Sequence, residues 1–110
     1  MITYNLTLED MPSRNKKLAN IAKVENFKSN RSGQPIANQF IITLQNGIEV
    51  FQSYNSIIAV KANNETYLDQ NRWNYSRTTS RYRNQFLNET TVETVKKIGF
   101  GNYTMVDLNK

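Results

Sequence analysis

The sequence predicts an α+β fold, in which an antiparallel sheet of four to six strands precedes two short C-terminal helices. Three observations support this prediction. Apolar and polar residues alternate along most of residues 2–68, and Asn46-Gly47 lies between two of the alternating runs. Beyond residue 76 the apolar spacing becomes helical, and each helical stretch follows a capping signal.

The first part of the chain predicts two strands. Residues 2–8 alternate with Ile2 and its even-numbered neighbours on one side, and Met11-Pro12-Ser13 ends this run. Residues 18–27 fit either a short helix or a strand. We favour a strand over about residues 21–28, because the Ser-, Gly- and Pro-containing stretch 29–35 then forms a long hairpin loop.

The centre of the chain predicts a series of hairpins. Residues 38–44 and 48–51 alternate on either side of Asn46-Gly47, which predicts a hairpin with a type I′ turn and positive φ at both central residues. Residues 57–60 form the next strand, and residues 66–68 pair back on it after an Asn-Asn turn.

The last third of the chain predicts two helices and a strand. Residues 76–79 offer several N-caps for a helix over residues 81–87. Thr90 and Glu93 form a capping-box pattern for a second helix. In that helix Val92, Val95 and Ile98 keep the helical period, Lys96-Lys97 lie in the last turn, and Gly99 ends it. Residues 103–108 alternate again as a final strand.

A length of 110 residues predicts one domain. Within it, residues 1–36 form a basic N-terminal strand and hairpin region, and residues 37–110 form the sheet with its helices. Neither repeats nor a linker divide the chain.

The composition argues against an enzyme. The chain has neither cysteine nor histidine, so disulfides, thiolate chemistry, the common zinc sites and the usual general base near neutral pH are all excluded. The nine acidic residues are scattered and match no metal-binding spacing, and no phosphate-binding or nucleophile motif is present. We therefore expect no catalytic residues, no metal site and no cofactor.

The chain contains no apolar run long enough to span a bilayer and no signal-peptide pattern at its N-terminus. We expect a cytoplasmic protein, in the cytosol of a host cell, with no membrane partner.

The positive charge is concentrated in two segments. The formal net charge is +5, and residues 71–88 alone contribute +4, because they contain four arginines and no acid. Such a concentration predicts binding to a polyanion, either DNA or RNA, or to an acidic host protein such as a defence nuclease.

The arginine-rich segment supplies most candidate binding residues. Arginines fit phosphate or carboxylate oxygens, and aromatic rings between them can stack on bases. The aromatic residues could instead serve the core, with the arginines as a solvated face. We expect the arginines to face outward. The candidates in this segment are Arg72, Trp73, Tyr75, Arg77, Arg81 and Arg83.

Other candidates lie outside that segment. Lys16, Lys17 and the hairpin-loop residue Arg31 could extend the basic surface, although flexible solubilising side chains are the simpler interpretation. Tyr54 lies in a polar, turn-forming stretch and is either an exposed contact or a buried corner residue. Unpaired edge strands in so small a sheet also make a homodimer possible.

A family resemblance adds a biological setting. It is carried by residues 51–60, Tyr67-Leu68, residues 73–79, residues 83–87 and residues 103–108. On this pattern the chain resembles a family of small uncharacterised proteins encoded by phages and mobile elements of low-GC Gram-positive bacteria, over about residues 36–109. The resemblance implies either an accessory nucleic-acid binder or an inhibitor of host defence, such as an anti-CRISPR protein. It supplies no catalytic motif.

Overall fold

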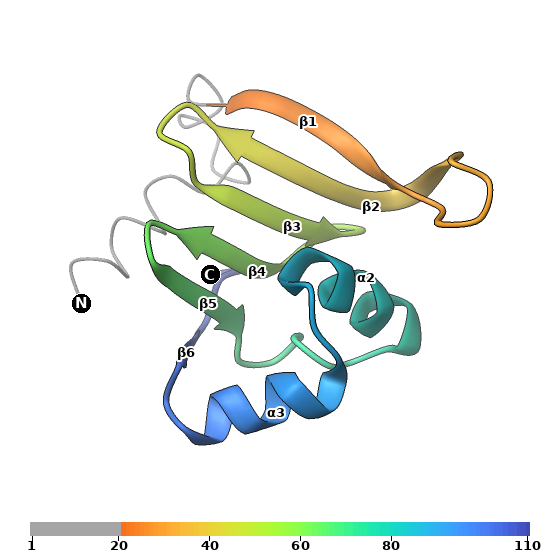
Figure 1. Cartoon of the computed structure of the whole chain (residues 1–110). Helices are drawn as coiled ribbons and strands as arrows, with labels where there is room; N and C mark the ends of the chain where they lie inside the picture. The colour runs from red at the N-terminus through yellow and green to blue at the C-terminus, as the bar shows by residue number, and fades with distance from the viewer. Residues whose placement is uncertain (1–20) are drawn as a thin grey trace.

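The computed structural model describes residues 21–110, which form a six-stranded sheet with two helices (Figure 1). The strands lie in the order of the sequence. Each of the first four is antiparallel to the next, whereas the sixth is parallel to the fifth. The elements in chain order are β1 (Ile21–Lys28), β2 (Pro35–Leu44), β3 (Glu49–Ser53), β4 (Ser56–Ala62), β5 (Glu65–Asp69), α2 (Arg77–Leu87), α3 (Thr91–Gly99) and β6 (Tyr103–Val106).

The predicted α+β class is confirmed, and so are the strand at residues 21–28 and the long loop that follows it. The prediction that the whole sheet is antiparallel is wrong at its last pair. After β5 the chain crosses over through α2 and α3 before it returns, and such a crossover allows β6 to run parallel to β5. The predicted strand at residues 2–8 lies outside the described residues.

The β2–β3 hairpin is confirmed, but its turn is not of type I′. Among its central residues only Gly47 has a positive φ, of 89°. The N–H of Gly47 donates to the carbonyl of Leu44, and the N–H of Leu44 donates to the carbonyl of Ile48. The connection therefore has three residues with glycine in the left-handed position, and a loop of that length needs only one residue with positive φ.

Two apolar clusters lie on opposite faces of the sheet. One contains Phe51, Ile58 and Leu68 and packs against Tyr82 and Phe86 of α2. The other is formed by the alternate strand residues, among them Val50, Val60 and Tyr67, together with Leu108. Because strand residues alternate between the faces, β4 is apolar on both sides and is buried over most of its length.

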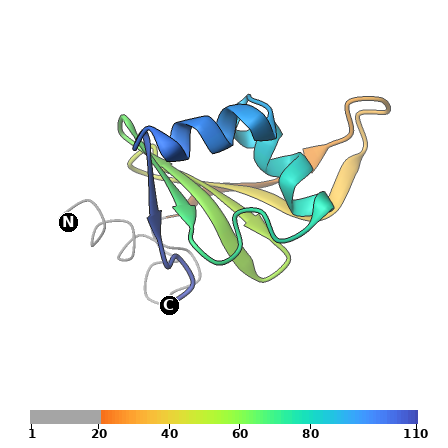
Figure 2. The same ribbon diagram turned by 90° about the horizontal axis from the view of Figure 1, so that it is seen from below.

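Both helices cover the same face of the sheet (Figure 2). Ser76 caps α2 by accepting a hydrogen bond from the N–H of Thr79, so the helix begins four residues earlier than the sequence predicts. Thr90 and Glu93 form the predicted capping box at α3, which is confirmed. Gly101, with φ of +78°, takes the left-handed position after α3.

Candidate polyanion-binding cleft

A cleft of about 910 Å³ opens between the β1–β2 loop and the outer side of α2. The loop and the start of α2 lie toward the same end of the sheet (Figure 1, right). Three arginines from these two elements line it, with polar side chains between them. Its lining, as far as the described part of the chain goes, is Ser29, Asn30, Arg31, Ile36, Arg77, Ser80, Arg81, Tyr82, Asn84, Gln85 and Thr91. We call it the arginine cleft.

The helix α2 supplies one wall of the arginine cleft. Arg77 and Arg81 are four residues apart, so they lie on the same side of the helix. Tyr82 and Phe86 are buried against the sheet, which fixes the rotation of the helix and leaves both arginines exposed. The earlier helix start is what brings Arg77 onto the helix.

The β1–β2 loop supplies the opposite wall and is held by its own hydrogen bonds. Ser29 Oγ accepts from the backbone N–H groups of Arg31, at 3.1 Å, and of Ser32, at 3.3 Å. The N–H of Gly33 donates to the carbonyl of Ser29 at 3.0 Å, and its φ of +73° is one that glycine adopts without strain. The backbone at Arg31 is therefore preorganised.

The charged residues that are described in the arginine cleft are all positive. Among residues 21–110 its lining contains three guanidinium groups and no carboxylate. Within residues 21–110, Arg31, Arg77 and Arg81 form no ion pair. Uncompensated cations in a concave site produce a positive potential that attracts anions.

Local stability rules do not explain this arrangement. Arg77 is in the first turn of α2, where the helix dipole disfavours a cation, and that turn has no acidic residue. Arg77 and Arg81 also form a like-charge pair at i, i+4, which costs helix stability. Among residues 21–110 no ion pair offsets these two unfavourable placements of charge.

Arg83 contradicts the prediction that all four arginines of the segment face outward. Arg83 belongs to α2, and its side chain is fully buried. Its Nη1 donates to the carbonyl of Trp73 at 2.6 Å, and its Nη2 donates to Thr91 Oγ1 at 2.9 Å. Further bonds reach the side-chain oxygens of Asn74 and Asn84. Burial lowers the pKa of Arg83, and the charge of Glu89 offsets part of that effect. The side chain joins the segment before α2 to α3 and cannot contact a ligand.

The structure separates the remaining candidates from the arginine cleft. Arg72 lies in a turn, 3.9 Å from the buried carboxylate of Asp69. Trp73 is half-buried against the helix-side cluster, and the Arg83 guanidinium lies 5.1 Å from its ring, so the core interpretation holds for Trp73. Lys16 and Lys17 lie outside the described residues.

Two candidate tyrosines are exposed near the start of α2. Tyr75, which is 50% exposed, directly precedes the N-cap. Tyr54, which is 52% exposed, follows Ser53, whose hydroxyl lies 3.1 Å from that of Thr79 in the first turn of the helix. Of the two interpretations of Tyr54, the structure supports the exposed residue. Neither tyrosine lines the arginine cleft itself.

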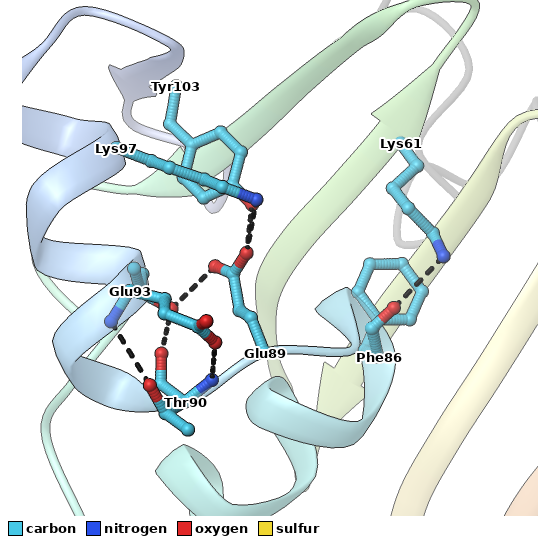
Figure 3. Close-up of polar contacts among 8 residues, drawn as sticks. Lys61, Phe86, Glu89, Thr90, Glu93, Lys97 and Tyr103 are labelled. Atoms are coloured by element: carbon cyan, nitrogen blue, oxygen red, sulfur yellow. Dashed lines mark hydrogen bonds and ion pairs between the residues drawn. The ribbon is translucent and has the colours of Figure 1, made fainter.

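A second polar cluster joins the end of α2 to α3 and β6 (Figure 3). The Glu89 side chain is only 3% exposed and accepts hydrogen bonds from Thr94 at 2.6 Å, Lys97 at 2.7 Å and Tyr103 at 2.8 Å. Burial raises the pKa of Glu89, but the bonds from Lys97, Thr94 and Tyr103 outweigh burial and leave the pKa lowered. Burial and the bond to Glu89 raise the pKa of Tyr103 to about 12. An ionised carboxylate with three donors is a structural anchor rather than a free base.

Residues 21–110 contain neither a metal-binding cluster nor a membrane-spanning helix. In this part of the chain no group of three or more acidic, histidine or cysteine side chains is placed to hold a metal ion. No helix here is long and apolar enough to cross a membrane.

Several residues of the arginine cleft were not predicted from the sequence. Ser80, Asn84 and Gln85 carry no motif, and Thr91 reaches the cleft only because α3 begins beside α2. A helical projection of residues 77–85 would have placed Ser80, Arg81, Asn84 and Arg77 close together on one side. No sequence signal indicates that the β1–β2 loop faces them.

The fold and the cleft together define a small α+β protein whose sheet is covered on one face by two helices, with an arginine-lined cleft beside the first helix. Residues 22–102 match a family of unknown function (DUF8033), and the chain belongs to that family. Comparison with the curated proteins gives no match, and comparison with the solved structures gives none either.

Proposed function

We propose that this chain is a non-enzymatic accessory protein that binds nucleic acid, DNA or RNA, through the arginine cleft. The observation that carries the proposal is the set of three exposed arginines, Arg31, Arg77 and Arg81, that line one cleft in which no other described residue is a carboxylate. Arginine pairs well with phosphate oxygens, and phosphate contacts supply most of the affinity in non-specific nucleic-acid binding.

The setting of the proposal rests on the resemblance to small proteins of phages and mobile elements. We extend it to a role in the host cytosol, where nucleic acid is accessible. Binding rather than catalysis is supported by the lining of the cleft, in which residues 21–110 place no carboxylate to act as an acid or base.

The test is the salt dependence of binding to fluorescent single-stranded and duplex oligonucleotides. Three phosphate contacts predict that affinity for duplex DNA falls about 40-fold between 50 and 200 mM salt, and affinity for a single strand about 18-fold. The double variant Arg77→Gln/Arg81→Gln is expected to remove about two units of the slope that three contacts give. The matched control is Lys23→Gln, because Lys23 is exposed, pairs with Glu25 and lies outside the cleft. Absence of binding at low salt, or binding that ignores salt, would refute the proposal.

A second candidate function is stoichiometric inhibition of a host defence system, in the manner of an anti-CRISPR protein. The observation that favours it is the exposure of Tyr54 and Tyr75 beside the arginine-bearing helix, since tyrosine and arginine are enriched in the residues that dominate protein interfaces. This function predicts a complex with a defence nuclease that survives nuclease treatment and is lost in Arg77→Gln/Arg81→Gln. A complex that disappears when nucleic acid is digested would exclude it.

A further inference from the structure

The helix α3 leaves an apolar stripe exposed. Thr94 is its one buried residue and Ile98 is half-buried, so these two define the side that faces the rest of the chain. Val92 and Val95 point away, 64% and 52% exposed, and Phe100 at the end of the helix is 80% exposed. Large apolar side chains grouped in this way on a surface mark an interaction site.

Gly99 lies on the same stripe, because residues 92, 95 and 99 follow the i, i+3, i+7 spacing of one helix side. Its φ is not in the left-handed region, and a Cβ added there would meet nothing within 4 Å. Gly99 is the last residue of α3, where glycine costs the helix little, and no packing contact within residues 21–110 requires its small size. A glycine on an exposed helix side permits another helix to approach closely.

The charges beside the stripe identify that partner. Glu93 lies in the first half of α3 and Lys96 in the second half, on the same flank of the stripe. Two copies of α3 related by a two-fold axis, and running antiparallel, bring the same flank together with its order reversed. Glu93 of one copy then lies alongside Lys96 of the other.

The same pairing matches the shapes. With the two-fold axis close to Val95, Val92 of each copy lies opposite Gly99 of the other, and the exposed Phe100 directly follows that contact in the chain. A parallel pairing would place Glu93 and Lys96 on opposite sides of the joint and lose the charge match. We infer that the stripe Val92, Val95, Gly99 and Phe100 is the contact between two copies of this chain, paired through antiparallel α3 helices.

The pairing has a geometric consequence for the arginine cleft. Thr91 at the start of α3 lines the cleft, so an antiparallel pair carries one cleft at each end of the joined helices. The pairing does not depend on nucleic-acid binding, because none of its four residues lines the cleft.

Sedimentation velocity of the ligand-free full chain over a wide concentration range tests the inference. The expected result is a reversible shift from the monomer mass of 12.8 kDa toward twice that mass. Gly99→Leu is expected to raise the dimer Kd at least tenfold, because leucine fits the open space within one chain but blocks the partner helix. Lys96→Glu is expected to weaken the dimer as well, by facing Glu93 of the partner with a like charge.

Val24→Lys is the matched control, since Val24 is a comparably exposed apolar residue on the edge strand β1. Circular dichroism of each variant separates loss of pairing from loss of fold. A chain that stays monomeric at every concentration overturns the inference. So does a dimer that Gly99→Leu leaves intact and Val24→Lys dissociates, because the copies would then join through the sheet edge. Loss of nucleic-acid binding in an intact dimer would instead contradict the proposed function alone.

Discussion

Arg83 shows how much one side chain contributes to this fold. It is a buried cation whose hydrogen-bond partners are all neutral oxygens, and they belong to the segment before α2, to α2 itself and to α3. The planar fork of arginine reaches Trp73 with one nitrogen and Thr91 with the other, which a lysine ammonium cannot do.

We therefore predict that Arg83→Lys lowers the free energy of unfolding by about 2–3 kcal/mol, because buried acceptors lose charged hydrogen bonds. Urea denaturation followed by circular dichroism measures the effect. Arg72→Lys is the control and is expected to change stability by less than about 0.5 kcal/mol, because its partner Asp69 is 3.9 Å away and its own side chain is partly exposed. Equal effects of the two substitutions would contradict the structural role of Arg83.

At Arg77 we predict that a substitution raises the stability of the fold, in contrast to Arg83. Arg77→Glu replaces a cation at the positive end of α2 with an anion and turns the pair with Arg81 into an attractive one. We expect stability to rise by about 0.5 kcal/mol, while nucleic-acid binding weakens. Thermal unfolding and oligonucleotide titration of the same preparation measure both. A variant that loses stability would show that Arg77 serves the fold.

At the scale of the elements, the sequence predicted what local signals encode. The capping box at Thr90 and Glu93 defined the start of α3, because both partners lie within four residues of each other. The core interpretation of the aromatic residues is confirmed for Trp73, which packs against the cluster that contains Tyr82 and Phe86. The burial of Arg83 was not predictable, since all its partners except its helix neighbours come from elements whose packing no pattern specifies.

The residues of the arginine cleft were also only partly predictable from the sequence. Arg77 and Arg81 share a helix side only if the helix begins before residue 81, and α2 does begin at Arg77. The approach of Arg31 was suggested only as a loop that could reach a ligand. Its position depends on how far the β1–β2 hairpin extends beside α2, and that follows from tertiary packing.

The β1–β2 loop supports a prediction about preorganisation. Gly33→Ala adds no clash but forces alanine to a φ of +73°, so we expect a loss of about 1 kcal/mol of stability, confined to this hairpin. Nucleic-acid affinity is expected to fall with it, because the loop that carries Arg31 is loosened. Hydrogen exchange of residues 29–34 and oligonucleotide titration measure the two effects. Unchanged exchange in this loop would argue against the strain.

At the scale of the molecule, the Glu89 cluster sets how stability depends on pH. The lowered pKa of Glu89 means that its contribution is complete above the pKa of the unfolded chain and is lost as pH falls through the folded value. The pKa of Tyr103, raised to about 12, means that its contribution is complete below about pH 10 and is lost as pH rises toward 12.

We predict that Tyr103→Phe lowers stability at pH 7 by about 1 kcal/mol, through the lost bond to Glu89, and flattens the decline of stability above pH 10. Denaturant midpoints measured from pH 4 to pH 11 report both effects. Tyr75→Phe, at an exposed tyrosine, is expected to leave the profile of the wild-type chain unchanged. An alkaline decline that persists in Tyr103→Phe would assign it to another group.

The parallel pairing of β6 with β5 has a consequence for the order in which the chain folds. Strands β1 to β5 are joined by short connections, so each can pair with the next strand in the sequence without closing a long loop. The last strand pairs Thr66 with Tyr103, and the N–H of Leu108 donates to the carboxylate of Asp69 at 2.8 Å. Each of these contacts closes a loop of nearly forty residues, and the entropy cost of closing that loop must be met before the contact forms. We therefore expect β6 to dock last, which leaves the edge of β5 without its partner strand until that step.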